Sequence, residues 1–270
     1  ADMTERQKKR EACYELLDIV VSGFHVYGEI YIPGRSRGES FPCICLFHGF
    51  PGVTGNDDLA QYFMRQGFVV FRPYHRGAWG SEGYYSFTGA VEDALAVATY
   101  AYEKGADMYH IDRDRIYLVG HSMGGQTVLN ATRRLPFVKA TVAAATFNLA
   151  KLFRMGREEE FRTEILPMGQ ILRTEEKDAL LKDARENYRQ LDIEDAVEDL
   201  KDRNLYLIEG KYDEIAFPER YVYPFWEKLS EYQTDAVRRL ETLPASHDFP
   251  ECRQILAEKI ADWLEKEELQ

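Results

Sequence analysis

A serine, a histidine and a carboxylate in this chain have the types and the order that nucleophilic catalysis requires. Ser122 lies at the centre of the sequence Gly-His-Ser-Met-Gly at residues 120–124. A serine hydroxyl is a poor nucleophile at neutral pH, so it needs a histidine to take its proton and a carboxylate to support that histidine. His247 and Asp213 are the candidates for these two roles. Together the three side chains would attack an acyl carbonyl carbon and form an acyl-serine intermediate.

The residues around Ser122 predict a strand, a tight turn and a helix. The apolar run at residues 115–119 precedes the turn, and a helix-forming stretch at residues 126–131 follows it. In a Gly-x-Ser-x-Gly elbow the serine occupies a strained turn, and small flanking residues let the strand and the helix pass closely. The alternative is a glycine-rich turn that contains a serine by chance. The strand before the motif and the helix after it favour the elbow.

His247 and the carboxylate follow two later strands. The apolar run at residues 205–208 leads to Asp213, and a strand near residues 236–242 leads to His247. Because the carboxyl ends of parallel strands meet at one edge of a sheet, both side chains are expected on the edge that carries Ser122.

Two neighbouring carboxylates compete with Asp213 for the role of acid. Glu214 is adjacent to it, and Asp248 is adjacent to His247. Asp213 is favoured because it lies at the apex of its loop. Asp248 is next to the base in sequence and would not easily reach back to its ring.

An oxyanion that forms during acyl transfer needs two hydrogen-bond donors. The backbone N–H of Met123 is one candidate, because it opens the helix after the serine. The other is the N–H of Phe50, in the loop at residues 48–52 that follows the buried strand predicted at residues 43–47. The ring of Phe50 could also be a plain hydrophobic wall, and the two interpretations are compatible.

The order of these elements predicts the fold class. Two β-rich runs, at residues 16–21 and 25–32, indicate an antiparallel hairpin at a sheet edge. Strands and helices then alternate, which is typical of an α/β protein with a mostly parallel sheet, here of about eight strands.

The alternation stops in a charged stretch between two of the later strands. We predict a first core part at residues 1–146, a mainly helical lid insertion at residues 147–203 and a second core part at residues 204–270. The alternative for the insertion is a solvated decoration at the periphery of the fold.

Composition excludes several other classes of function. The formal net charge of −12 over 270 residues argues against nucleic acid or an anionic membrane as the main partner. No apolar run is long enough to span a membrane and the first residues lack the apolar core of a signal peptide, so a cytoplasmic location is expected. The four cysteines lack metal-ligand spacing. Acyl transfer through a serine requires neither a metal nor a cofactor, so none is expected. A small-molecule partner is predicted, and a homodimer is left open.

The motifs together resemble the α/β-hydrolase superfamily of serine hydrolases. The resemblance covers residues 24–147 and 204–264, and the chain order serine, aspartate, histidine is that of the superfamily. It is carried by the following motifs: His48-Gly49-Phe50, the elbow at residues 120–124, Gly210-x-x-Asp213 and Ser246-His247-Asp248-Phe249. Within the superfamily, the elbow and the charged insertion are similar to bacterial feruloyl (cinnamoyl) esterases, which bind substrate between core and lid. The segment at residues 76–83 resembles prolyl-oligopeptidase-like catalytic domains less closely.

Three functions are compatible with the sequence. The resemblance implies a carboxylesterase that acts on aromatic or short-chain acyl esters. A peptidase or amidase would require a charged anchor for a peptide terminus. A non-catalytic binding protein on the same fold is disfavoured, since such relatives are expected to lose a member of the triad. The residues that bind the substrate are unknown from the sequence.

Overall fold

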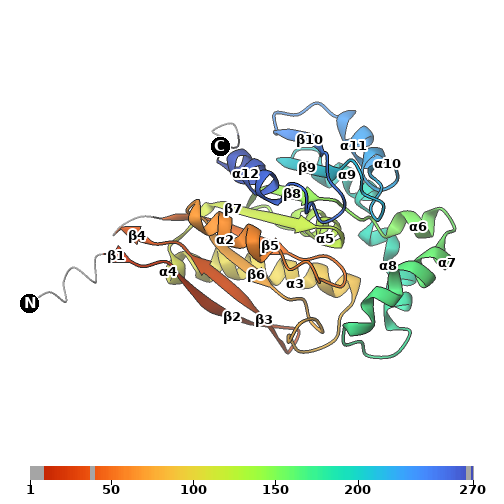
Figure 1. Cartoon of the computed structure of the whole chain (residues 1–270), viewed down its shortest axis with the longest axis horizontal. Coiled ribbons are helices and arrows are strands. Elements are labelled where there is room, and N and C mark those ends of the chain that lie inside the picture. Colours follow the sequence, from red (N-terminus) through yellow and green to blue (C-terminus); the bar gives the residue numbers. More distant parts are fainter. Residues whose placement is uncertain (1–8, 37–39, 266–268, 270) are drawn as a thin grey trace, which may run out of the picture.

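The computed structural model describes residues 9–36, 40–265 and 269. Within these residues, eight strands form one sheet in the order β10-β9-β8-β7-β5-β6-β3-β2 (Figure 1). The strands are β2 (Cys13–Val21), β3 (Phe24–Ile32), β5 (Phe41–Phe47), β6 (Val69–Pro73), β7 (Ile111–His121), β8 (Val138–Ala144), β9 (Leu205–Gly210) and β10 (Arg238–Leu243). Strands β6, β5, β7, β8, β9 and β10 run parallel to one another. At one edge β2 and β3 form an antiparallel hairpin, and β3 is also antiparallel to β6. The predicted α/β-hydrolase fold with a mostly parallel sheet is therefore confirmed.

Helices cover both faces of the sheet, because its central strands are apolar on both sides. The helices of the core are α2 (Asp57–Arg65), α3 (Phe87–Tyr100), α4 (Ala106–Tyr109), α5 (Met123–Thr132), α10 (Pro218–Tyr221), α11 (Tyr223–Ser230) and α12 (Arg253–Leu264). One hydrophobic cluster joins a face of the sheet to α3, α5 and α11, and a second joins the other face to α2 and α12.

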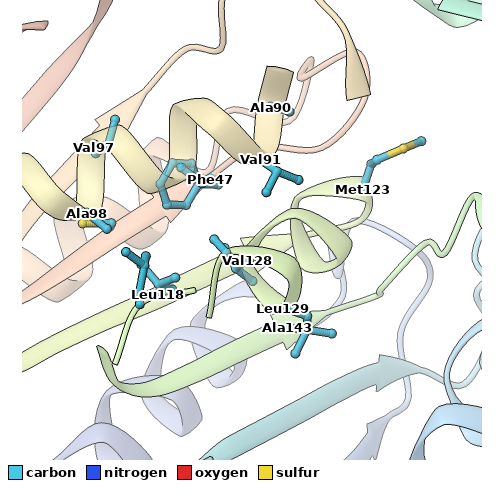
Figure 2. Packing of buried hydrophobic residues seen from close by; sticks show 14 of the residues in the cluster. Phe47, Ala90, Val91, Val97, Ala98, Leu118, Met123, Val128, Leu129 and Ala143 are labelled. Atoms are coloured by element: carbon cyan, nitrogen blue, oxygen red, sulfur yellow. The ribbon is translucent and has the colours of Figure 1, made fainter. Parts of the chain in front are cut away.

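The first of these clusters packs together β7 and α5, the strand and the helix that flank the turn at Ser122. Figure 2 shows Phe47 and Leu118, from adjacent strands, facing Val91 of α3 and Val128 of α5. All four side chains are buried. Burial of apolar surface stabilises by roughly 25 cal/mol per Å², so this packing fixes α5 rigidly on the sheet.

The chain between β8 and β9 forms a group of short helices beyond one end of the sheet (Figure 1). These are α6 (Ala150–Arg154), α7 (Glu158–Glu160), a π-helical turn (Phe161–Ile165), a 3₁₀ helix (Leu166–Ile171), α8 (Ala179–Leu191), a second 3₁₀ helix (Ile193–Ala196) and α9 (Val197–Leu200). The interpretation of residues 147–203 as a lid stays a prediction, and so do the domain boundaries.

Local structure differs from the sequence interpretation in three places. The stretch near residues 219–231 forms two helices, α10 and α11, because Pro224 in the first turn of α11 lacks the N–H that a continuous helix would use. After α3, residues 101–105 form a π-helical turn. A short antiparallel pair, β1 (Lys9–Arg10) with β4 (Arg35–Ser36), has no apolar alternation that would have indicated it.

Within the described residues, no helix is both long and apolar enough to cross a bilayer. The cytoplasmic location stays a prediction, and the N-terminal residues 1–8 lie outside the described part of the chain.

Candidate active site

Ser122 occupies the sharp turn between β7 and α5. Its backbone has φ 59° and ψ −125°, a conformation that L-residues rarely adopt. The strand and the helix pass so closely that a Cβ at Gly120 would lie 2.1 Å from the carbonyl oxygen of Gly124. The N–H of Ser122 donates to the carbonyl of Ala144 at 2.8 Å, which ties the turn to β8. The hydroxyl is therefore held at the carboxyl edge of the sheet.

The structure brings His247 and Asp213 to this hydroxyl. The Ser122 Oγ lies 2.8 Å from His247 Nε2, and His247 Nδ1 lies 2.7 Å from Asp213 Oδ2. An ionised carboxylate only accepts hydrogen bonds, so Nδ1 carries the ring proton. The lone pair of Nε2 is then free to accept the serine proton, which is the geometry of general-base activation.

Asp213 is held as a carboxylate by donors on both of its oxygens. The backbone N–H groups of Ile215 and Ala216 donate to Oδ1 at 2.8 and 2.7 Å, while His247 occupies Oδ2. Burial acts to raise the pKa of Asp213, but the hydrogen bond and electrostatic interaction with His247 and the two backbone hydrogen bonds outweigh it, so the pKa lies below its ordinary value.

The two other candidate acids lie elsewhere. Glu214 is exposed at the surface. Asp248 accepts a hydrogen bond from the Thr54 hydroxyl at 2.7 Å. Among the described residues, only Asp213 is hydrogen-bonded to His247 Nδ1.

A second buried histidine supports the loop that carries His247. His121 Nε2 donates to the backbone carbonyl of His247 at 2.9 Å, and the two rings lie 5.1 Å apart. Burial and the proximity of His247 lower the pKa of His121 to about 4. The ring is therefore neutral at physiological pH and fixes the loop without placing a positive charge beside His247.

The loop after β5 lies against Ser122, as expected for an oxyanion loop. A Cβ at Gly49 would lie 2.7 Å from the Ser122 Cβ. His48 Nδ1 donates to the carbonyl of Gly49 at 2.7 Å, and burial with the nearby His75 lowers the pKa of His48 to about 3, so the ring stays neutral. This carbonyl and the N–H of Phe50 belong to one trans peptide and point in opposite directions. The hydrogen bond from His48 therefore orients the Phe50 N–H.

An apolar cavity of about 150 Å³ adjoins the serine. It is lined by Gly49, Phe50, Pro51, Gly52, Val53, Thr54, His121, Ser122, Met123, Phe147, Ile165, Met168, Ile215, His247 and Asp248. Sequence reasoning named Phe50 and Met123 but missed Ile165 and Met168, which come from the segment between β8 and β9. Their signal was weak, since they lie in a short apolar run at residues 165–168 that has no regular helix or strand period and stands within a charged stretch.

A buried acid that sequence reasoning also missed lies at the end of β9. Glu209 is fully buried, accepts the N–H of Thr146 at 3.2 Å, and has a second oxygen without a partner among the described residues. Burial and the charge of Asp213 raise the pKa of Glu209 above its ordinary value. In the described part of the chain, no group of His, Cys, Asp and Glu side chains is arranged to hold a metal ion.

The raised pKa of Glu209 predicts a pH-dependent stability cost. The unfolded carboxyl group ionises as the pH rises above its ordinary pKa while the folded group resists ionisation, so the cost of folding grows with pH. Glu209→Gln removes this cost, so it should raise the melting temperature little at pH 5 and by a few degrees at pH 8. The expected size follows because about 1 kcal/mol of stability shifts the melting temperature of a large domain by roughly 2–4 °C. Calorimetry of both proteins over this range, with the exposed Glu219→Gln as control, tests it. A gain of equal size at both pH values would contradict it.

Comparison with known proteins identifies the family. The sequence model of the family described as serine aminopeptidase, S33, matches residues 38–196, which is more than half of the chain. The chain belongs to this family of α/β-hydrolases. The family is one of α/β-hydrolases, in agreement with the resemblance of the motifs.

The individual proteins and structures that this S33-family chain resembles have low sequence identity to it. Bis(hydroxyethyl) terephthalate hydrolase of Streptomyces coelicolor is 27% identical over 152 residues, which are 51% of this chain and 44% of that protein. The chain therefore aligns with less than half of the length of this relative. The structure of Est1E from Butyrivibrio proteoclasticus with ferulic acid bound is similar, with a TM-score of 0.67 at 19% identity. The alignment covers 92% of this chain and 97% of the Est1E chain. Dipeptidyl peptidase 4 of Porphyromonas gingivalis has the same TM-score and identity. That alignment covers 94% of this chain and 35% of the peptidase chain.

Proposed function

We propose that this hydrolase is a carboxylesterase of the feruloyl (cinnamoyl) esterase type, which cleaves small esters of aromatic or short-chain acids through an acyl-enzyme intermediate. The observation that carries the proposal is the chain of contacts from Asp213 through His247 to Ser122 beside an apolar cavity. In this proposal Ser122, His247 and Asp213 are the catalytic triad.

The contacts support a complete reaction cycle. Ser122 Oγ attacks the ester carbonyl carbon while His247 Nε2 takes its proton. The N–H groups of Phe50 and Met123 bind the oxyanion of the tetrahedral intermediate. When the bond to the alcohol breaks, His247 returns the proton to the alcohol oxygen, and an acyl ester of Ser122 remains. Water, activated by His247 in the same way, then releases the acid.

The cavity favours a small apolar acyl group. A buried apolar cavity of about 150 Å³ in another protein accommodates one benzene ring, and the cavity beside Ser122 has this size. The names of two relatives also refer to aromatic acids, namely terephthalate and ferulic acid. An open groove adjoins the cavity and shares Ile215, His247 and Asp248 with it, so we assign the groove to the leaving alcohol, which must receive its proton from His247.

The family name and the likeness to a dipeptidyl peptidase make an aminopeptidase the alternative. Such an enzyme needs an anchor for the charged peptide terminus. Among the described residues, Asp248 is the single Asp, Glu, Lys or Arg side chain in the lining of the cavity, and the Thr54 hydroxyl already donates to it. The esterase proposal requires no anchor of this kind.

The activity test is a panel of p-nitrophenyl esters and amino-acid p-nitroanilides. The wild type should hydrolyse acetate, butyrate and benzoate esters well, octanoate poorly and the anilides least. Met168→Ala should raise kcat/KM for octanoate relative to acetate by about tenfold, because a change of one or more methylene groups in an apolar pocket is worth roughly 10–200-fold. Met155→Ala is the matched control, since Met155 lies in the same segment but does not line the cavity. Preference for the anilides would favour the peptidase, and an equal shift in both variants would remove Met168 from the acyl pocket.

A further inference from the structure

The side chain of Phe50 is clamped from several sides, although its backbone is the part proposed to act in catalysis. Its ring centroid lies 5.6 Å from that of Tyr85 and 5.3 Å from that of Phe87. From the segment between β8 and β9, Gly169 lies so close that a Cβ there would be 2.4 Å from Phe50 Cζ. The ring is buried, so this clamp restricts the whole residue.

The two aromatic neighbours of Phe50 are themselves held by the same segment. The N–H of Tyr85 donates to the carbonyl of Arg173 at 2.8 Å. The N–H of Phe87 donates to Asp183 Oδ2 at 2.7 Å, and the Thr88 hydroxyl donates to Oδ1 at 2.6 Å. Asp183 thus caps the first turn of α3 from a different part of the chain, which satisfies N–H groups that the helix leaves unpaired.

These contacts do not serve to cover the cavity. Phe147, Ile165 and Met168 of the segment line it, whereas Gly169, Arg173 and Asp183 do not. Their contacts lead instead to Tyr85, Phe87 and the Phe50 ring.

We propose that the segment at residues 147–203 positions the oxyanion loop, with Gly169 and Asp183 as positioning residues that act on the Phe50 N–H through the Phe50 ring. The inference rests on the proposed function, because it concerns the stabilisation of the same oxyanion. A donor that is displaced from the developing oxyanion loses most of its effect, so the segment contributes to turnover as well as to substrate choice.

The decisive variant is Gly169→Ala, assayed with p-nitrophenyl acetate. The added methyl group should displace the Phe50 ring and lower kcat about 10–100-fold with KM nearly unchanged, a fraction of the roughly 10²–10³ that one oxyanion donor supplies. Gly156→Ala is the matched control. Gly156 lies in the same segment at φ +67° with open space around it, so its substitution strains the backbone without a contact to Phe50. The control should lower the melting temperature and leave kcat unchanged.

A double-mutant cycle with Phe50→Ala separates positioning from general damage. Phe50→Ala keeps the N–H but removes the ring, so adding Gly169→Ala to it should cost no further activity. Additive effects, or a kcat for Gly169→Ala equal to that of the control, would overturn the proposal. Asp183→Ala, which leaves the contact of Gly169 with Phe50 untouched, should lower kcat in the same way. It keeps the proposal testable if Gly169→Ala does not fold.

The proposed function can fail separately. Labelling of Ser122 by a small fluorophosphonate and ester hydrolysis by the wild type test the nucleophile. If the wild type is active and labelled while kcat of both Gly169→Ala and Asp183→Ala matches the control, only the positioning role fails. If the wild type neither labels nor hydrolyses esters, the proposed function fails first.

Discussion

Ser122→Ala is expected to lower ester hydrolysis by about 10⁶-fold in kcat, the loss seen when a catalytic serine is removed from a serine protease. No other hydroxyl among the described residues is hydrogen-bonded to His247 Nε2. Alanine cannot form the acyl ester, so His247 would have no nucleophile to activate. Residual hydrolysis would come only from substrate binding and the oxyanion donors.

The measurement combines p-nitrophenyl acetate turnover with labelling by a fluorophosphonate, followed by mass spectrometry of the labelled peptide. The variant should lose both signals and keep its melting temperature near that of the wild type, because the turn is held by backbone contacts to Ala144 and Phe147 that alanine retains. Ser246→Ala is the control. Ser246 is adjacent to His247 in sequence, but its hydroxyl donates to Glu251. Retained labelling in Ser122→Ala would place the nucleophile elsewhere.

The sheet and the order of the candidate triad could be predicted because both depend on short sequence patterns, namely apolar runs and the motifs that follow them. Apolar runs of four or more residues, such as 205–208, mark strands that are buried on both faces. Ser122 and Asp213 each follow such a run, whereas the strand before His247 is the partly exposed β10, which contains Arg238, Arg239 and Glu241. The place of Asp213 at the apex of its loop favours it over Glu214, and in the structure Asp213 is the one at hydrogen-bond distance from His247.

Features that depend on long-range packing could not be predicted. The apolar run of the sequence ends at Ile208, yet β9 continues to Gly210 with Glu209 buried. Ile165 and Met168 lie on a π-helical turn and a short 3₁₀ helix, whose periods differ from the 3.6 residues that reveal an amphipathic helix. The contact of Gly169 with Phe50 joins residues 119 positions apart, and no local pattern records it.

Asp213→Asn is expected to lower kcat by about 10⁴-fold, a loss caused in a serine protease triad by the wrong histidine tautomer. Here the reason lies in the contacts of both carboxylate oxygens. The N–H groups of Ile215 and Ala216 require an acceptor at Oδ1, so the asparagine carbonyl oxygen should take that place. Its NH₂ group then faces His247 Nδ1, which must accept a hydrogen bond. The ring proton moves to Nε2, where it points at Ser122 and blocks proton removal.

Two adjacent substitutions make this prediction specific. Glu214→Gln should change kcat by less than about twofold, because an exposed charge contributes little to a buried site. Asp248→Asn should also have a small effect, since Asp248 bonds to Thr54 rather than to the His247 ring. Steady-state kinetics on p-nitrophenyl butyrate measures all three variants. NMR of the imidazole nitrogens should detect the proton on Nδ1 in the wild type and on Nε2 in Asp213→Asn. A large loss in Glu214→Gln with normal turnover in Asp213→Asn would assign the acid to the neighbouring residue, and the tautomer argument would fail with it.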